Sequence, residues 1–505
     1  GSGAAMVDAF ASLSVVDLKV QDDLTVTDDV SIGGDAAVTG ALTGGTVNGV
    51  GISSNITNFS QSILISNDAG TGTLSTASNN TGLGFEVFDD LTSGDDNTAL
   101  GMQALTKLTG GTQNVAIGLS ALGADTLGSR SVAIGGNALI AQNFTTATNA
   151  YNTAVGANAG SSVTTGTKNT FVGGLSGDAT TTATENTAVG YNSATGTTTG
   201  GQNTSVGAES FVSNTTGASN TALGYGALYS NTTASSNTAV GRDALIVNTT
   251  GTQNTSVGHN ALDANTTASN NTAVGFSSLT DNQTGASNAA FGSFSLENNT
   301  TGGSNTACGH NALAGNTTAS NNTAVGKGAL ELNTTGTFNT AMGSASLDAN
   351  TTGSNITAVG YNALGANTTA NNNTALGYNV LSSNTTGQHN IGIGGNDATN
   401  LATLANNTTG SQNVGIGMAA LLNNSTASNN TAVGYQSLRS NTTGEANVAI
   451  GTSALDTNTT ASNNTAVGFA AMDANTIGAN NVAVGANALD ANTTADNNTA
   501  VGKGS

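Results

Sequence analysis

The stretch Asn237-Thr238-Ala239-Val240-Gly241 recurs in similar form every 17 residues along most of the 505-residue chain. We number each repeat from this glycine as position 0 and call it the ruler glycine. There are 25 such glycines with two slips in spacing, and they include Gly84, Gly101, Gly241, Gly258 and Gly502. A fixed period of this size indicates units that stack on their neighbours to bury their apolar side chains, as in a solenoid.

One repeat contains two short apolar pairs, Ala239-Val240 and Ala244-Leu245, separated by the glycine and two variable residues. Neither pair is long enough for a helix, and β-branched residues bounded by Gly and Asn are typical of strands and turns. We therefore expect two short strands per coil, with Ala, Val and Leu inside. The glycine is expected to supply a backbone conformation or close approach that a Cβ would obstruct.

Stacked coils place identical residues one strand spacing apart, which predicts ladders of Asn over Asn and Thr over Thr. At about 4.8 Å per coil the repeats form a rod on the order of 120 Å long. The predicted fold is thus all-β, a parallel β-solenoid of 17-residue coils. Because each coil buries so few apolar side chains, we also expect several chains to associate side by side.

The composition excludes several classes of protein. Aromatic residues make up 4% of the chain, Trp and Pro are absent, and the formal net charge is −21. Such a charge disfavours nucleic acid and anionic membranes as partners. No apolar run is long enough to cross a bilayer, so we expect no membrane insertion. The single cysteine, Cys308, takes the slot before a ruler glycine, where it is expected to be a small buried side chain.

Several repeats, such as Asn114-Val115-Ala116-Ile117-Gly118 and Asn447-Val448-Ala449-Ile450-Gly451, resemble the YadA-like head repeat. That repeat occurs in trimeric autotransporter adhesins and in bacteriophage tail fibres. The resemblance implies a left-handed parallel β-roll, three chains packed side by side, and attachment to a receptor. The period of 17 is longer than is usual in that family, and no anchor, neck or stalk is visible.

The chain divides into four predicted segments. Residues 1–16 are interpreted as an expression scar and lead-in, and 80–505 as the rod. Residues 17–46 follow a six-residue rhythm, as in Asp23-Leu-Thr-Val-Thr-Asp28, typical of a β-structured shaft. Residues 47–79 are rich in Gly, Ser and Asn and are predicted to form a connector. The hexads resemble the shafts of phage fibres.

Position +1, after the ruler glycine, is the most variable and holds a row of candidate receptor-binding residues. Phe276, Phe469, His259, His310, Arg242 and Lys327 occupy this slot, as do the tyrosine candidates Tyr191, Tyr225, Tyr361, Tyr378 and Tyr435. A slot this permissive is typical of a solvent-facing position. Its functional interpretation is a row able to stack on sugars or dock on a receptor.

Two insertions break the period, one between Gly135 and Gly156 and one between Gly394 and Gly417. Insertions in a solenoid usually form loops at a corner, and loops on a rigid scaffold often bind ligands. In the first insertion, Phe144 and Tyr151 are candidate receptor-binding residues. In the second, the candidate is Asn400, near Leu404. Insertions without any function would give the same pattern in the sequence.

Other motifs give weaker evidence of a functional site. The three histidines are too far apart along the rod for a zinc site. An ion on a three-fold axis, bound by one His from each of three chains, remains an alternative. Acidic pairs such as Asp95-Asp96 are interpreted as solvated turns rather than calcium ligands. Asn-Thr-Thr, as at Asn248, satisfies the N-glycosylation pattern but recurs because the coil needs a corner there. No catalytic set or phosphate-binding loop is present, so we expect neither an enzyme nor a cofactor.

The leading hypothesis is a trimeric, rod-like adhesion fibre that acts outside the cell, on a virion tail or a cell surface. Its partner would be a host-cell surface glycan or protein receptor. One alternative is a structural spacer or extracellular filament subunit without a receptor. Another is an ice-binding solenoid, because rows such as Thr249-Thr250 can match a lattice.

Overall fold

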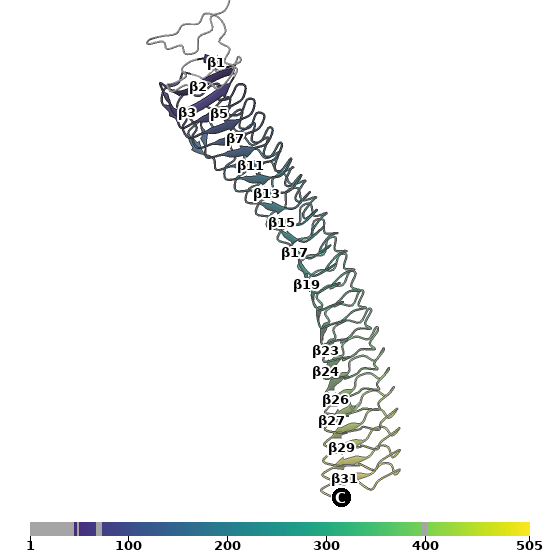
Figure 1. Ribbon diagram of the computed structural model, residues 1–505. Helices are drawn as coiled ribbons and strands as arrows, with labels where there is room; N and C mark the ends of the chain where they lie inside the picture. Colours follow the sequence, from purple (N-terminus) through teal and green to yellow (C-terminus); the bar gives the residue numbers. More distant parts are fainter. Residues whose placement is uncertain (1–44, 48–49, 67–72, 396–400) are drawn as a thin grey trace, which may run out of the picture.

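The computed structural model of the chain describes residues 45–47, 50–66, 73–395 and 401–505, and the side chains from residue 57 onward within these ranges. Figure 1 shows a long, gently curved rod built of stacked coils. The described part is all-β, a parallel solenoid of about 25 turns. The predicted lead-in of residues 1–16 and the hexads up to residue 40 lie outside the described residues.

Each full coil contributes one short strand that ends just before its ruler glycine. The strands of the coils are β5 (Thr81–Leu83), β6 (Thr98–Leu100), β7 (Val115–Ile117), β9 (Val132–Ile134), β11 (Thr153–Val155), β12 (Thr170–Val172), β13 (Thr187–Val189), β14 (Thr204–Val206), β15 (Thr221–Leu223), β16 (Thr238–Val240), β17 (Thr255–Val257), β18 (Thr272–Val274), β19 (Ala289–Phe291), β20 (Thr306–Cys308), β21 (Thr323–Val325), β22 (Thr340–Met342), β23 (Thr357–Val359), β24 (Thr374–Leu376), β25 (Ile391–Ile393), β26 (Val414–Ile416), β27 (Thr431–Val433), β28 (Val448–Ile450), β29 (Thr465–Val467), β30 (Val482–Val484) and β31 (Thr499–Val501).

Neighbouring strands pair in parallel and in register, so that equivalent residues of successive repeats lie side by side. Thr238, Ala239 and Val240 of β16, for example, pair with Thr255, Ser256 and Val257 of β17. The strands belong to a single 29-stranded sheet that runs the length of the rod. The register holds across both period slips, because β9 pairs with β11 and β25 with β26. Neither insertion therefore shifts the pairing of the strands on its two sides.

The amino-terminal end of the described rod begins with an antiparallel arrangement. β1 (Gly45–Val47) pairs with β2 (Val50–Ile56), and β2 pairs with β3 (Phe59–Ser66). β3 then pairs in parallel with β4 (Ala77–Ser78) and β5. Phe59 and Leu64 of β3 are buried, so this hairpin covers the apolar interior of the first coils. The predicted connector of residues 47–79 thus contains part of the sheet.

The expectation of two strands per coil is wrong. Among the described coils, a second strand pair forms at the amino-terminal end, where β4 pairs with β3, and at the first insertion, where β8 (Gly128–Ser129) pairs with β10 (Thr148–Asn149). The second apolar pair itself lies in a turn, as at Leu245, whose φ is 52°. A left-handed conformation interrupts an extended strand, so these residues cannot form a ladder like the first pair.

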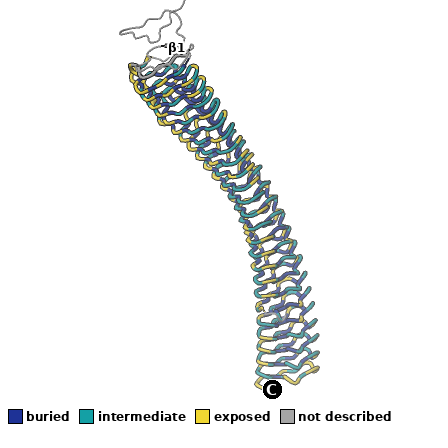
Figure 2. Tube along the Cα trace, in the orientation of Figure 1, coloured by how far each residue is buried: buried dark blue, intermediate teal, exposed yellow. Residues whose placement is uncertain are grey.

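The core is narrower than the sequence indicates. Ala239, Ala244 and Leu245 are fully buried, whereas Val240 lies at the outer surface of its strand. Alternate residues of a strand point to opposite sides, so the small Ala239 faces inward and Thr238 and Val240 face outward. The expectation that the Val packs inside is wrong. Figure 2 shows buried residues recurring coil after coil along the rod.

Cys308 corrects a second expectation for the same reason. It occupies the outward slot of β20 and is exposed, while Ala307 beside it is fully buried. The interior accommodates a small side chain from the strand together with a Leu from the facing turn.

The ruler glycine is needed for the reason expected. Gly258 has a φ of 142°, and a Cβ built on it would lie 2.2 Å from the carbonyl oxygen of Gly275 in the next coil. L-residues rarely adopt this conformation, and the close approach leaves no room for a methyl group.

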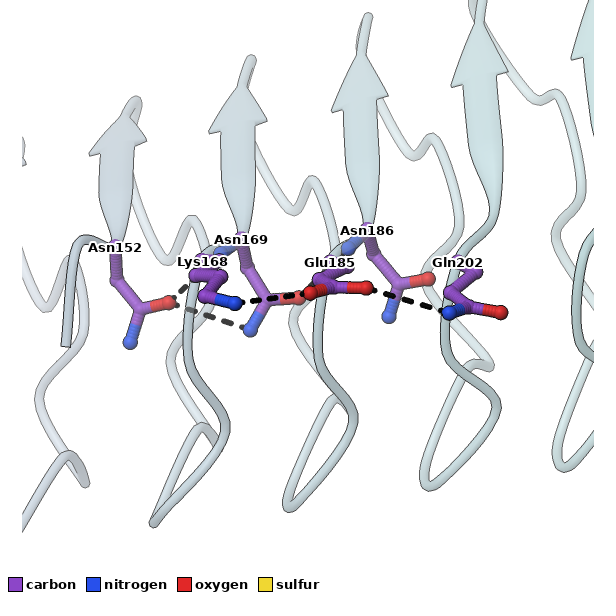
Figure 3. Close-up of polar contacts among 6 residues, drawn as sticks. All are labelled: Asn152, Lys168, Asn169, Glu185, Asn186 and Gln202. Carbon is purple, nitrogen blue, oxygen red and sulfur yellow. Dashed lines mark hydrogen bonds and ion pairs between the residues drawn. The ribbon is translucent and has the colours of Figure 1, made fainter.

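Two internal columns of asparagine hold the coils together, which bears out the predicted Asn ladder. In the first, the Asn152 Oδ1 accepts a hydrogen bond from the Asn169 backbone NH at 2.9 Å, and the Asn169 Oδ1 accepts one from the Asn186 NH at 3.0 Å (Figure 3). In the second column, the Asn248 Nδ2 donates to the Asn231 Oδ1 at 3.2 Å and to the Gly251 carbonyl at 3.0 Å. Buried amides that satisfy one another in this way fix the stacking.

Candidate binding surfaces

The coil presents three chemically different surfaces. The strand surface carries Thr at position −3 and an apolar residue at position −1, as in Thr238 and Val240. The turn from +1 to +6 carries variable residues, including aromatic and charged ones. The third surface, from +8 to +12, carries Thr, Ser, Asn and Gln, as in residues 249–253.

Apolar side chains at position −1 form an exposed row along the strand surface, which we call the apolar row. Its exposed members are Leu83, Leu100, Ile134, Val172, Leu223, Phe291, Met342, Ile393, Ile416, Ile450, Val484 and Val501, with Cys308 in the same row. Because the strands pair in register, these side chains follow one another at one strand spacing. An apolar patch this long is unusual on a monomer and is typical of an interaction surface.

The five candidate tyrosines at position +1 are all exposed, and Tyr191 is the most exposed at 59%. Tyr361 and Tyr378 stack on each other with ring centroids 5.2 Å apart. Tyr225 donates a hydrogen bond to the Glu209 carboxylate at 2.9 Å, and this bond raises the pKa of the phenol. The structure therefore pairs some members of the row and leaves Tyr191 and Tyr435 without an aromatic neighbour among the described residues.

An aromatic cluster that sequence reasoning missed spans four coils. His259 stacks on Phe276 with ring centroids 5.5 Å apart, and Phe294 bridges Phe276 and His310 at 5.3 and 5.9 Å. Phe294 lies at position +2, so a search confined to position +1 overlooks it. Because these rings face or edge one another, less of each ring face is free to stack on a sugar.

Hydrogen bonds to the neighbouring coil hold the first insertion in place. Phe144 is buried, and its backbone NH donates to the Asp125 Oδ1 at 3.2 Å. Asp125 also accepts from Gln142 at 2.6 Å, and burial raises the pKa of its carboxyl. Tyr151 is exposed and is held by Arg130, which donates to its hydroxyl and lies over its ring. Of the two candidates here, Tyr151 is the accessible one.

The second insertion is described only in part. Asn400 lies outside the described residues, whereas Leu404 is fully buried as a core residue. Thr403 bridges the gap in the period, because its hydroxyl lies 2.9 Å from the carbonyl oxygen of Gly394 and 2.7 Å from that of Gly417. Thr403 thus links the ruler glycines on the two sides of the second insertion.

Charged side chains gather in the turn at positions +5 and +6. Burial raises the pKa of Asp263 to about 6, and the carboxylates of Asp281 and Asp243 also raise it. Glu297, in the coil after Asp281, has its pKa raised by burial and by that carboxylate. Among the described residues no group of three His, Cys, Asp or Glu could hold a metal ion.

The asparagines of the Asn-Thr-Thr sequences face inward. Asn231, Asn248 and Asn265 are fully buried, and the Nδ2 of each donates to the preceding coil and to a carbonyl of its own coil. In the folded rod these nitrogens are inaccessible for glycan attachment.

No protein-family model matches the chain, and no curated protein sequence matches it significantly. Among the described residues no helix is long and apolar enough to cross a membrane.

Proposed function

We propose that the chain is the shaft of a rod-like adhesion fibre in which three copies pack side by side through the apolar row. The observation that carries the proposal is the row itself, which continues along the strand surface from Leu83 to Val501. Burying it against neighbouring chains removes this apolar surface from water, at roughly 25 cal/mol per Å². The number three comes from the resemblance to YadA-like head repeats.

The adhesive function would use surfaces outside the packed strands. The exposed +1 tyrosines and Tyr151 supply aromatic rings and hydroxyls on a rigid support, which suits contact with a host-cell surface glycan or protein receptor. A fibre of this kind works outside the cell, on a virion tail or a cell surface. A spacer or filament subunit without a receptor would share the shaft and differ only in binding nothing.

Sedimentation equilibrium tests the assembly. The trimer should sediment at about three times the 48.9 kDa chain mass, and a species of the chain mass alone would refute the proposal. Replacing Val240 and Val274 in the apolar row by Lys should shift the equilibrium to monomer, because unpaired charges would face a neighbouring chain. The matched control places Lys at Thr250 and Thr284, which lie in the same two coils on another surface, and should leave the trimer intact.

Binding to host cells tests adhesion separately. Fluorescently labelled fibre should bind susceptible cells, and replacing Tyr361 and Tyr378 by Ser should reduce that binding without changing the mass in sedimentation. A trimer that binds no cell type and no glycan would support the spacer function instead.

A further inference from the structure

One threonine recurs on the third surface without interruption. It lies eight residues before the next ruler glycine, which is position +9 of a 17-residue coil, in every coil from Thr165 to Thr460. All of these side chains are exposed, and in the described structure their hydroxyls donate no hydrogen bond to protein. We call this array the Thr column.

The fold does not require threonine at this position. Coils outside the column carry Ser93, Gly110, Leu127 and Ile477 in the same slot, and their strands pair as the others do. The glycosylation pattern gives no reason for the threonine either, because the asparagine two residues earlier is buried and hydrogen bonded. The repetition is therefore best explained by the surface that it creates.

The backbone beneath the Thr column is held firmly. In one coil the NH groups of Thr249 and Thr250 both donate to the Thr266 carbonyl of the next coil, at 2.9 and 3.3 Å. The Thr249 hydroxyl donates to the same carbonyl at 3.1 Å. The Thr250 hydroxyl and methyl group consequently project from a fixed backbone and repeat at about 4.8 Å, the strand spacing.

The surface around the column is uncharged over most of its length, the exceptions being Lys168, Glu185 and Glu445 near its ends. From Gln202 to Thr443 every described Lys, Arg, Asp and Glu lies at positions +1, +2, +5 or +6, and none lies between +8 and +12. Over the same span Phe338 and His389 are the only rings on this surface among the described residues. It therefore lacks both the charges that bind ionic polymers and the regular aromatic platform that binds polysaccharides.

We propose that the Thr column binds the surface of ice. Each threonine offers a methyl group, beside which water is orientationally restricted, and a hydroxyl that can take a place in the water lattice. A rigid repeat of about 4.8 Å, comparable to the repeat distance of the ice lattice, holds these groups in order before binding, which lowers the entropic cost of association. This activity goes beyond receptor adhesion and depends on the Thr column rather than on the apolar row.

Inhibition of ice recrystallisation by the full chain tests the proposal. The wild-type protein should stop crystal growth at micromolar concentration, and the triple variant Thr318→Lys, Thr335→Lys, Thr352→Lys should need about tenfold more protein or lose the activity. The reason is that three charges would have to be desolvated against an uncharged lattice. Absence of inhibition by the wild type, or full activity in the triple variant, would overturn the proposal.

A control with the same added charge is available at position +1, where Lys327 shows that lysine is accepted. The variant Ser293→Lys, Ser344→Lys, Thr452→Lys should retain wild-type activity, and an equal loss there would refute assignment to the Thr column. Circular dichroism and thermal melting of both variants establish that they fold. Retention on insoluble cellulose without any effect on ice would assign the surface to a polysaccharide and overturn the ice proposal. Sedimentation of the same samples reports separately on the trimer, so either proposal can fail alone.

Discussion

Phe171 and Gly177 have complementary sizes across the interior of the rod. A Cβ built on Gly177 would lie 2.4 Å from the Phe171 ring. A Cβ on Gly160, in the preceding coil, would also clash with this ring. In most coils the small side chain is instead in the strand and the large one in the facing turn, as with Ala239 and Leu245. The interior has a nearly fixed volume per coil, which the two elements share.

This exchange of volume predicts a rescue. Phe171→Ala should lower the free energy of unfolding by about 3–5 kcal/mol, because it leaves a cavity in the core. Adding Gly160→Leu and Gly177→Leu should restore much of it, since Leu adopts the same backbone conformation in this slot elsewhere, as at Leu245. Urea unfolding of the single and triple variants measures both effects. No recovery in the triple variant would show that the coils do not exchange volume in this way.

The internal asparagine column should be costly to interrupt. Asn254→Ala removes the acceptor for the Asn271 backbone NH and the donor to the Ala268 carbonyl. Leaving these buried groups unpaired should cost about 2–4 kcal/mol in the free energy of unfolding. The control is Asn423→Ala on the exposed surface, where the backbone is not left-handed, and it should change stability by less than about 0.5 kcal/mol. Similar values for the two variants would contradict a structural role for the column.

The ruler glycine predicts a backbone effect. Gly258→Ala should destabilise the rod by several kcal/mol, because it combines an unfavourable φ with a clash against the Gly275 carbonyl. Gly136→Ala should be nearly neutral, since nothing lies within 4 Å of a Cβ at that position. Thermal melting compares the two, and an equal melting temperature for the Gly258 variant and the wild type would exclude the steric argument.

Asp263 predicts a pH dependence. Its pKa is about 6 in the folded rod and 3.8 in the reference state, so the folded form binds the proton more tightly. Its contribution to stability is present below pH 3.8 and is lost as the pH rises from there to about 6. Allowing for partial solvent exposure, about 1–2 kcal/mol is involved. Asp263→Asn should flatten this part of the curve of unfolding free energy against pH, and an unchanged curve would argue against it.

Cys308 reports on the apolar row. In a free chain its exposed thiol should react rapidly with a maleimide, whereas in a trimer packed through the strand surface it should be protected until the chains dissociate. Labelling rates at concentrations above and below dissociation provide the measurement. Rapid labelling of a stable trimer would place the interface on another surface.

The sequence by itself determined the period, the solenoid, the parallel stacking of equivalent residues and the need for glycine at position 0. These follow from local repetition and backbone sterics, which act within a coil or between adjacent coils. Asn-over-Asn pairing was predictable for the same reason. The absence of a second strand in most coils was not, because it depends on left-handed residues such as Leu245 that carry no distinctive local pattern.

Only the tertiary structure decided which residues face inward. In Thr238-Ala239-Val240 the alternation allows either Ala239 or the pair Thr238 and Val240 to be inside, and hydrophobicity favours the Val. The narrow space opposite the Leu of the facing turn selects the Ala instead, so Val240 and Cys308 face outward. The apolar row arises from this choice, and the aromatic cluster from His259 to His310 and the Thr column arise from the stacking of turns in successive coils. They are properties of how the coils close and stack, which the order of residues within one repeat does not specify.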